Sequence, residues 1–335
     1  MSRGIYSSML GNDFYQDSEK ELIVELQRYH RYWYDLIVHP NEVAEYFDSR
    51  ELIVDYLKAV KKNVEDNLEK RFVYFICSRT KIRFNIDKKP FYNPITKKVK
   101  IHILVGKNEK KQTIKCQFFD IPSNKFCNPK LDITDKYITV TDSRGDLITA
   151  SIHDFLEQSN INLGLYSNVE YVGYTKNPHT RPTNSSHAGL SDVLYKVSNE
   201  SFDTFIYFNV FKVTTRAVNN QAKLNIIISN AMTNELDVEL EGKLIEKCFI
   251  FYFDALSQNR NKDKEMKELK NNLDKIYKEN KIKRVNFIYE FEEENEYGVF
   301  SSSKVSPSVN HTFNVIKVKD KVEIKTGLES FETTM

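Results

Sequence analysis

The hydrophobic pattern of the central part of the chain repeats every two residues, and this feature constrains the fold most. Apolar and aromatic side chains alternate with polar ones in four segments, at residues 71–77, 98–106, 113–119 and 136–142. Such alternation is typical of β-strands with one buried face. The polar stretches at 106–112 and 143–146 predict hairpin connections between them. We therefore expect a β-rich region here.

Helical periodicity precedes this region. Ser18 and Glu21 have the spacing of a capping box, and apolar residues then recur at spacings of four, three, four and three: Leu22, Leu26, Tyr29, Trp33 and Leu36. Pro40 is expected to end this first helix. Asp48 and Glu51 repeat the capping signature, with Leu52, Tyr56 and Val60 continuing one face. Residues 18–70 are therefore predicted to be helical.

Helices and strands alternate in the second half of the chain. The patterns predict a short helix at 151–158, a hairpin formed by 202–215 and 223–229, a helix from Asp237 to Phe253 and an amphipathic helix beginning near Asp263. Strands then follow, with a turn at Lys319-Asp320. The predicted fold class is α+β, with a small mixed β-sheet flanked by helices, a helical N-terminal region and β-rich flanks.

Composition bounds the partners and the compartment. The net charge is only +2, because 49 basic and 47 acidic residues nearly cancel, so affinity for nucleic acid would have to come from local patches. The four cysteines form no CxxC pair, which favours reduced thiols in a cytoplasmic protein. The longest apolar run, Cys248–Phe253, is too short to span a bilayer, so no membrane partner is expected.

Residues 262–284 carry a local excess of positive charge, with nine Lys/Arg against five Asp/Glu. A charged, solvated helix face explains this composition, and a face that follows a phosphate backbone explains it as well.

Groups suited to phosphodiester chemistry gather between Gly164 and His187. A strand-like Val169–Gly173 is followed by a turn, and Arg181 and His187 come within one or two helical turns of it. A phenol, a guanidinium and an imidazole are thereby placed near one another. Arginine offers a planar fork to two phosphate oxygens.

The region 164–261 resembles the GIY-YIG endonuclease superfamily, which places two tyrosine-bearing strands beside a helix carrying an arginine, then a third strand and a helix with a metal-binding glutamate. Tyr171-Val172-Gly173 matches the second signature, and Arg181 follows Tyr171 by ten residues. Gly164-Leu165-Tyr166 matches the first signature, although it precedes Tyr171 by only five residues. Glu241 stands where the family has its glutamate, with Leu244-Ile245 after it.

The resemblance implies a role for each of these residues. Tyr171 would position or deprotonate water, with Tyr166 as the tyrosine of the first signature, and Arg181 would neutralise the phosphate. His187 would assist proton transfer, Asn259 (or Asn261) would orient the scissile phosphate, and Glu241 would hold Mg²⁺ or Mn²⁺. Mg²⁺ keeps several waters and needs few protein ligands, so a single carboxylate is sufficient. A phenol with an ordinary pKa near ~10 needs help from a metal or cation to act as a base.

The resemblance also implies an activity and a domain division. We expect a metal-dependent endonuclease acting on DNA, with an intracellular role in restriction or defence. Four regions are expected: a helical region at 1–70, a β-rich subdomain at 71–158, the nuclease-like core at 159–261, and an amphipathic helix with a β tail at 262–335. The flanking regions would serve target recognition, self-association or contacts with a protein partner.

Two alternatives remain at the level of sequence. A catalytically inactive nuclease-like core would bind nucleic acid or protein, using aromatic strands with interleaved lysines such as those at 205–213. A restriction-type PD-(D/E)xK core needs an E-x-K tripeptide, which occurs at Glu241–Lys243 and Glu323–Lys325, but such tripeptides are expected by chance in a chain this charged.

Overall fold

The described part of the chain is built around one large mixed β-sheet. The computed structural model describes residues 2–43, 47–66, 70–180, 201–255, 261–291 and 295–327. Within them, eight strands follow one another across the sheet and a ninth, β14 (Leu224–Ser229), pairs with β13. The eight are, in spatial order, β16 (Phe300–Ser301), β12 (Ser167–Thr175), β2 (Phe72–Thr80), β13 (Phe202–Asn219), β1 (Glu19–Trp33), β15 (Ile282–Glu290), β17 (Asn310–Val318) and β18 (Lys321–Thr326). The α+β class is confirmed.

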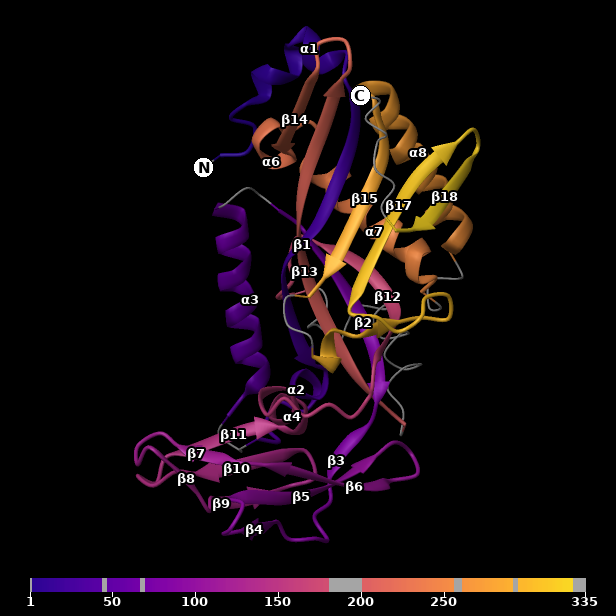
Figure 1. Cartoon of the computed structure of the whole chain (residues 1–335). Helices are drawn as coiled ribbons and strands as arrows, with labels where there is room; N and C mark the ends of the chain where they lie inside the picture. Colours follow the sequence, from indigo (N-terminus) through magenta and orange to yellow (C-terminus); the bar gives the residue numbers. More distant parts are fainter. Residues whose placement is uncertain are drawn as a thin grey trace.

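Helices cover both faces of this sheet (Figure 1). Helix α3 (Ser49–Asp66) lies on one face, where Ile53 and Leu57 pack against alternate residues of β2 and β13 such as Tyr74 and Phe208. Helices α7 (Val238–Phe253) and α8 (Lys262–Asn280) lie on the other face, where the larger core is built. Phe75 of β2 points to that side and packs edge-on against Phe249 of α7, with ring centroids 5.2 Å apart. The odd and even residues of β2 thus belong to two separate cores.

A β-rich insertion joins β2 to β12 and forms the foot of the molecule (Figure 1). It contains one sheet of β3 (Ile82–Phe84), β4 (Phe91–Asn93), β5 (Lys98–Val105) and β6 (Lys110–Cys116) and a pair of β7 (Phe118–Asp120) and β8 (Lys125–Cys127). A further sheet of β9 (Lys130–Ile133), β10 (Tyr137–Thr141) and β11 (Leu147–Ser151) leads into α4 (Ile152–Gln158). The predicted β-rich region and the helix after it are therefore confirmed.

Five short helices complete the described ranges. They are η1 (Ser7–Gly11), α1 (Asp13–Gln16), α2 (Asp35–Val38), α6 (Asn230–Thr233) and η3 (Glu296–Gly298). No helix in the described ranges has both the length and the apolar character needed to cross a bilayer.

The prediction of a helix at 18–36 is wrong, because most of this segment is the long strand β1. Leu22, Leu26, Tyr29 and Trp33 do share one face, as predicted. However, a β-bulge between Leu26 and Arg28 inserts one residue, which shifts the alternation and converts an even spacing into a spacing of three. A bulged strand therefore reproduces the 4-3-4 pattern of an amphipathic helix. β1 lies between β13 and β15.

The later predictions are mostly confirmed. Helix α3 begins after Asp48, whose carboxylate accepts the Glu51 amide at 3.0 Å, although Ile53 and Leu57 are its buried residues, whereas Leu52 and Tyr56 are exposed. The β13–β14 hairpin, α7, α8 and the Lys319-Asp320 turn are present. The large sheet takes strands from all four of the regions that were expected to be separate.

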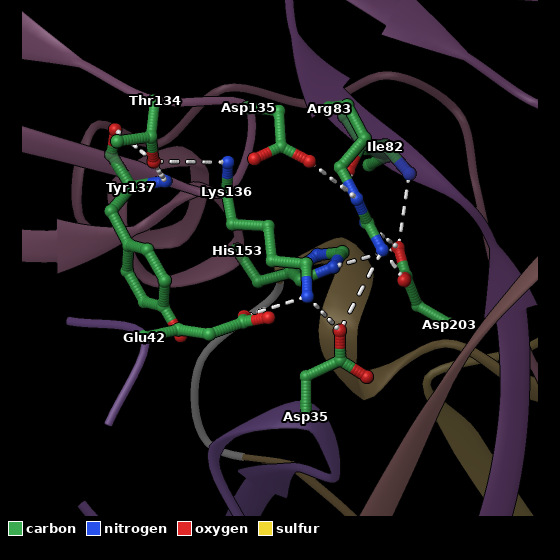
Figure 2. A network of polar contacts seen from close by, with 10 residues as sticks. All are labelled: Asp35, Glu42, Ile82, Arg83, Thr134, Asp135, Lys136, Tyr137, His153 and Asp203. Carbon is green, nitrogen blue, oxygen red and sulfur yellow. Dashed lines mark hydrogen bonds and ion pairs between the residues drawn. The ribbon is translucent and has the colours of Figure 1, made fainter. Parts of the chain in front are cut away.

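A buried polar network joins the insertion to the large sheet (Figure 2). The Asp203 carboxylate of β13 accepts the Ile82 amide at 3.0 Å, the Arg83 guanidinium at 2.9 Å and the His153 imidazole at 3.0 Å. Lys136 adds ion pairs to Asp35 at 3.1 Å and to Glu42. Burial lowers the pKa of His153. Burial would raise the pKa of Asp203, but the hydrogen bond from His153 and the positive charge of Arg83 outweigh this effect and lower it. We read this as a neutral imidazole beside an ionised carboxylate that holds the two parts together.

Candidate functional site

Strand β12 carries the Tyr171-Val172-Gly173 signature and directs its side chains to both faces of the sheet. Val172 is fully buried in the core beneath α7. Tyr171 packs on the opposite side, in the core beneath α3, where its ring centroid lies 5.9 Å from that of Tyr74 on the neighbouring strand β2. A Cβ at position 173 would lie 2.5 Å from the Tyr74 hydroxyl oxygen, so glycine is needed for this tyrosine to fit.

The partner strand of the signature differs from the prediction. Tyr166 lies in a non-strand segment before β12 and is 44% exposed, so Gly164–Tyr166 forms no hairpin with Tyr171. The strand antiparallel to β12 is instead β2, with Tyr171 opposite Ile76. The spacing of five residues from Tyr166 to Tyr171 is too short for two paired strands and a turn. The strand that does pair with β12, β2, precedes the insertion in the chain. Two tyrosine-bearing strands are therefore adjacent.

Helix α7 is capped by Asp237, whose carboxylate accepts hydrogen bonds from the backbone amides of Glu239 and Leu240, each at 2.9 Å. This cap fixes the first turn, which carries Glu239 and Glu241. Residues two positions apart in a helix are separated by about 200° around its axis, so the side chains of Glu239 and Glu241 point in different directions. Their environments are correspondingly different.

Glu241, the predicted metal ligand, is buried and already paired. Its carboxylate forms an ion pair with Arg3 at 2.8 Å and accepts a hydrogen bond from the Asn230 side-chain amide. It belongs to the helix that packs on the face opposite Tyr171. The structure therefore does not bring Glu241 and Tyr171 together around one ligand.

Glu239 instead forms an open polar cluster with the end of β12 and the start of β2. Its carboxylate accepts the Tyr174 hydroxyl at 2.6 Å and pairs with Lys176 at 2.6 Å and with Arg71 at 3.6 Å. We call Arg71, Tyr174, Lys176 and Glu239 the α7 site. Tyr174 is held against Gly242, where a Cβ would lie 2.3 Å from the ring. The helix start and the two strand ends thus meet at one point.

The electrostatics of the α7 site favour an ionised carboxylate and a neutral phenol. Burial alone would raise the pKa of Glu239, but the hydrogen bonds from Lys176 and Tyr174 and the charges of Lys176 and Arg71 lower it. Burial, followed by the hydrogen bond to Glu239, raises the pKa of Tyr174. The Glu239 side chain is 36% exposed, but its Oε1 atom is covered where it pairs with Arg71 and Lys176, so a ligand would reach this oxygen by displacing a cation.

Further positive charge surrounds the start of β2. Burial lowers the pKa of Lys70 to about 8, and the positive charges of Lys212, Arg3 and Arg28 act in the same direction, opposed by Glu241. Repulsion among these cations indicates that they lie near one another. Glu241 already offsets part of this positive charge, and its effect on the pKa of Lys70 is larger than that of any one of the three cations.

Three predicted residues, Arg181, His187 and Asn259, lie outside the described residues. The described chain reaches Thr180, five residues after β12 ends at Thr175. Asn261 directly precedes α8 and makes no side-chain cap there. The predicted roles of these residues remain predictions.

Sequence reasoning missed Tyr174, Glu239 and Arg71. Strand alternation placed Tyr174 on the same side as Val172, and Glu239 is two residues from the predicted glutamate, so both signals were present. The signal for Arg71 was absent, because its approach depends on the pairing of β2 with β12.

Among the described residues, no group of three His, Cys, Asp or Glu side chains gathers closely enough to hold a metal by itself. No family model, curated protein or solved structure matches the chain.

Proposed function

We propose that this chain is a metal-dependent nuclease that hydrolyses DNA phosphodiester bonds, with the α7 site at the centre of its chemistry. The observation that carries the proposal is the partly exposed, ionised Glu239 side chain, held by Tyr174 beside Arg71 and Lys176. The adjacent tyrosine strands β2 and β12, followed by a carboxylate-bearing helix, support the resemblance to the GIY-YIG superfamily.

Glu239 replaces Glu241 as the proposed metal ligand. Its ion pair with Lys176 is half-exposed and contributes little to stability, so exchanging the lysine for a divalent ion costs little. Mg²⁺ is commonly held by one or two carboxylates together with water and substrate phosphate. When bound there, the ion would activate water and offset the charge that develops on the phosphate.

The cations of the α7 site would then bind the substrate. Arg71 presents a planar guanidinium and Lys176 a point charge, and both become available for phosphate oxygens when Glu239 binds the metal. Arg181, by the family resemblance, would add a third cation, with His187 and Asn259 as proton carrier and phosphate-orienting group.

Tyr174 would act as a hydrogen-bond donor rather than as a base. Its raised pKa keeps the phenol protonated at neutral pH, so it holds the Glu239 carboxylate in position. Tyr171 packs beneath α3 and would support the sheet beside the site.

The test is nicking of supercoiled plasmid in Mg²⁺. We expect cleavage by the unmodified protein, loss of cleavage in EDTA, and at least a hundredfold loss in Glu239→Gln with an unchanged melting temperature. Asp263→Asn is the matched control, because Asp263 is an exposed acidic residue in the first turn of α8, and it should cleave normally. Equal rates for the two variants would contradict the assignment of Glu239.

A nucleic-acid-binding module without catalysis is the second candidate function. It is favoured by the fact that Glu239 already has three partners, which leaves the carboxylate neutralised without a metal. This alternative predicts no cleavage at any Mg²⁺ concentration and salt-sensitive DNA binding that survives EDTA.

A further inference from the structure

A basic groove runs between α8 and the neighbouring strands of the large sheet, on the side of the molecule where α8 lies beside β15 and β17 (Figure 1). Its volume is about 420 Å³. Its lining residues are Leu273, Asp274, Ile276, Tyr277, Ile282, Lys283, Arg284, Lys317 and Lys319. The α7 site shares none of these residues, so the groove is a separate feature.

The floor of the groove is apolar and firmly packed. Leu273 and Ile276 of α8 and Ile282 of β15 are at most 5% exposed. Between Ile282 and Arg284 the register of β15 against β1 shifts by one residue, which leaves Lys283 as a bulge. The bulge allows Ile282 to pack on the α8 side while Lys283 stays at the surface.

The walls of the groove are positively charged. Four cationic side chains line it against one carboxylate, Asp274, which pairs with Lys317. Lys283 pairs with Glu19 at 2.5 Å, but its side chain is 44% exposed. Lys319 is exposed at the β17–β18 turn, where its backbone is left-handed with a φ of 55°. The charge is therefore spread along both sides of the groove.

An exposed aromatic ring lies at the same groove. Tyr277 of α8 is 55% exposed, although its helix neighbours Leu273 and Ile276 are buried. Aromatic rings beside cations are the elements with which proteins bind single-stranded nucleic acid, because bases stack on the ring while phosphates contact the cations. An acidic protein would use the cations but has no need for an open ring.

We propose that this groove binds a segment of single-stranded nucleic acid, with Lys283, Arg284 and Lys319 contacting phosphates and Tyr277 stacking on a base. In a nuclease, such a groove would hold unpaired DNA at a surface separate from the α7 site. Binding at the groove does not require the α7 site or a metal, so it is testable even if the chain cleaves nothing.

The experiment measures the fluorescence anisotropy of a labelled single-stranded 20-mer titrated with the full chain in EDTA. We expect Lys283→Ala/Arg284→Ala/Lys319→Ala to weaken binding at least tenfold and to reduce the slope of log affinity against log salt by about two. Lys317 is left intact because it pairs with Asp274 and its side chain is only 20% exposed, whereas the Lys283 side chain is 44% exposed. The control, Lys107→Ala/Lys110→Ala/Lys111→Ala, removes three exposed charges from the insertion and should change affinity less than twofold.

A second variant tests whether the groove prefers single-stranded to duplex nucleic acid, independently of its positive charge. Tyr277→Leu should weaken binding of the single strand about tenfold or more and leave binding of a duplex of the same sequence unchanged. Equal affinities of the groove triple variant and the insertion control would overturn the proposal. So would preferential binding of duplex that is insensitive to Tyr277→Leu, or capture of a poly-glutamate peptide in preference to the oligonucleotide. Loss of plasmid cleavage with normal binding in this assay would contradict only the nuclease function.

Discussion

At the scale of single residues, the first turn of α7 places two similar carboxylates in different environments. Glu241 is buried against Arg3 and Asn230, whereas Glu239 is partly exposed and held by a phenol and two cations. The family resemblance pointed to Glu241, which lies two residues from Glu239 in the same turn. It could not distinguish the two glutamates, because their environments are set by Arg3 and Arg71, which come from distant parts of the chain.

This difference predicts opposite phenotypes. Glu241→Gln should lower the free energy of unfolding by about 3 kcal/mol, because it removes the negative charge that pairs with the buried Arg3 guanidinium. Glu239→Gln should lower it by less than about 1 kcal/mol, because its ion pairs are exposed. Urea unfolding of both variants measures this, and equal destabilisation would show that the two sites are not distinguished by burial.

Protonation of His311 is expected to destabilise the folded protein in mild acid. Burial lowers its pKa to about 4, and its imidazole lies 3.1 Å from the Tyr252 hydroxyl and 3.0 Å from the Ser308 carbonyl oxygen. The unfolded chain binds the proton near pH ~6.5, so stability is complete above that pH and falls by about 3 kcal/mol as the pH drops toward 4. The lowered pKa of His153 acts in the same direction.

Chemical denaturation at several pH values between 7 and 4 tests this assignment. His311→Gln should be less stable at pH 7 but should lose less stability on acidification. His39→Gln, which replaces an exposed histidine, should follow the unmodified protein. An unchanged pH dependence in His311→Gln would contradict the assignment.

At the scale of elements, local signals predicted most helices and hairpins but not β1. Helix α7 has its capping residue next to it in sequence, and the β13–β14 hairpin closes through a short turn, so both were readable. In β1 the bulge after Leu26 produced a helical spacing, and the strand is fixed by β13 and β15, which are far away in the chain. Long-range pairing overrode a local pattern.

The contact between α7 and β12 depends on the absence of a side chain at Gly242. Gly242→Ala should destabilise the protein by about 1–3 kcal/mol, because its Cβ would lie 2.3 Å from the Tyr174 ring, even though alanine favours helix. It should also reduce plasmid cleavage by displacing Tyr174 from Glu239. Gly11→Ala is the control, since nothing lies within 4 Å of its added Cβ. Normal stability of Gly242→Ala together with normal cleavage would contradict this packing.

At the scale of the whole molecule, the insertion separates strands that pair with one another. β2 and β12 are adjacent in the sheet, but the β-rich insertion and α4 lie between them in the chain. The sequence pattern therefore predicts four consecutive regions. It also predicts that the strand next to Tyr171 carries Tyr166, whereas the neighbouring strand β2 carries Tyr74. Nothing in local periodicity reports which strands will be neighbours across such a distance.

The network around Asp203 should control how firmly the insertion is attached. Asp203→Asn removes the charge that Arg83 and His153 share, and we expect a loss of about 3–5 kcal/mol of stability. Limited proteolysis should release fragments of the insertion sooner than in the unmodified protein. Asp87→Asn, at an exposed aspartate of the insertion, is the control. Equal proteolysis of both variants would show that the network does not hold the two parts together.

The position of a bound divalent ion tests the central claim most directly. Anomalous diffraction from crystals soaked in Mn²⁺ should show a peak in contact with the Glu239 carboxylate, beside Tyr174 and Arg71, and none at Glu241. This peak should be absent in crystals of Glu239→Gln. A peak elsewhere, or no peak under conditions in which the protein cleaves plasmid, would contradict the assignment of the α7 site as the catalytic centre.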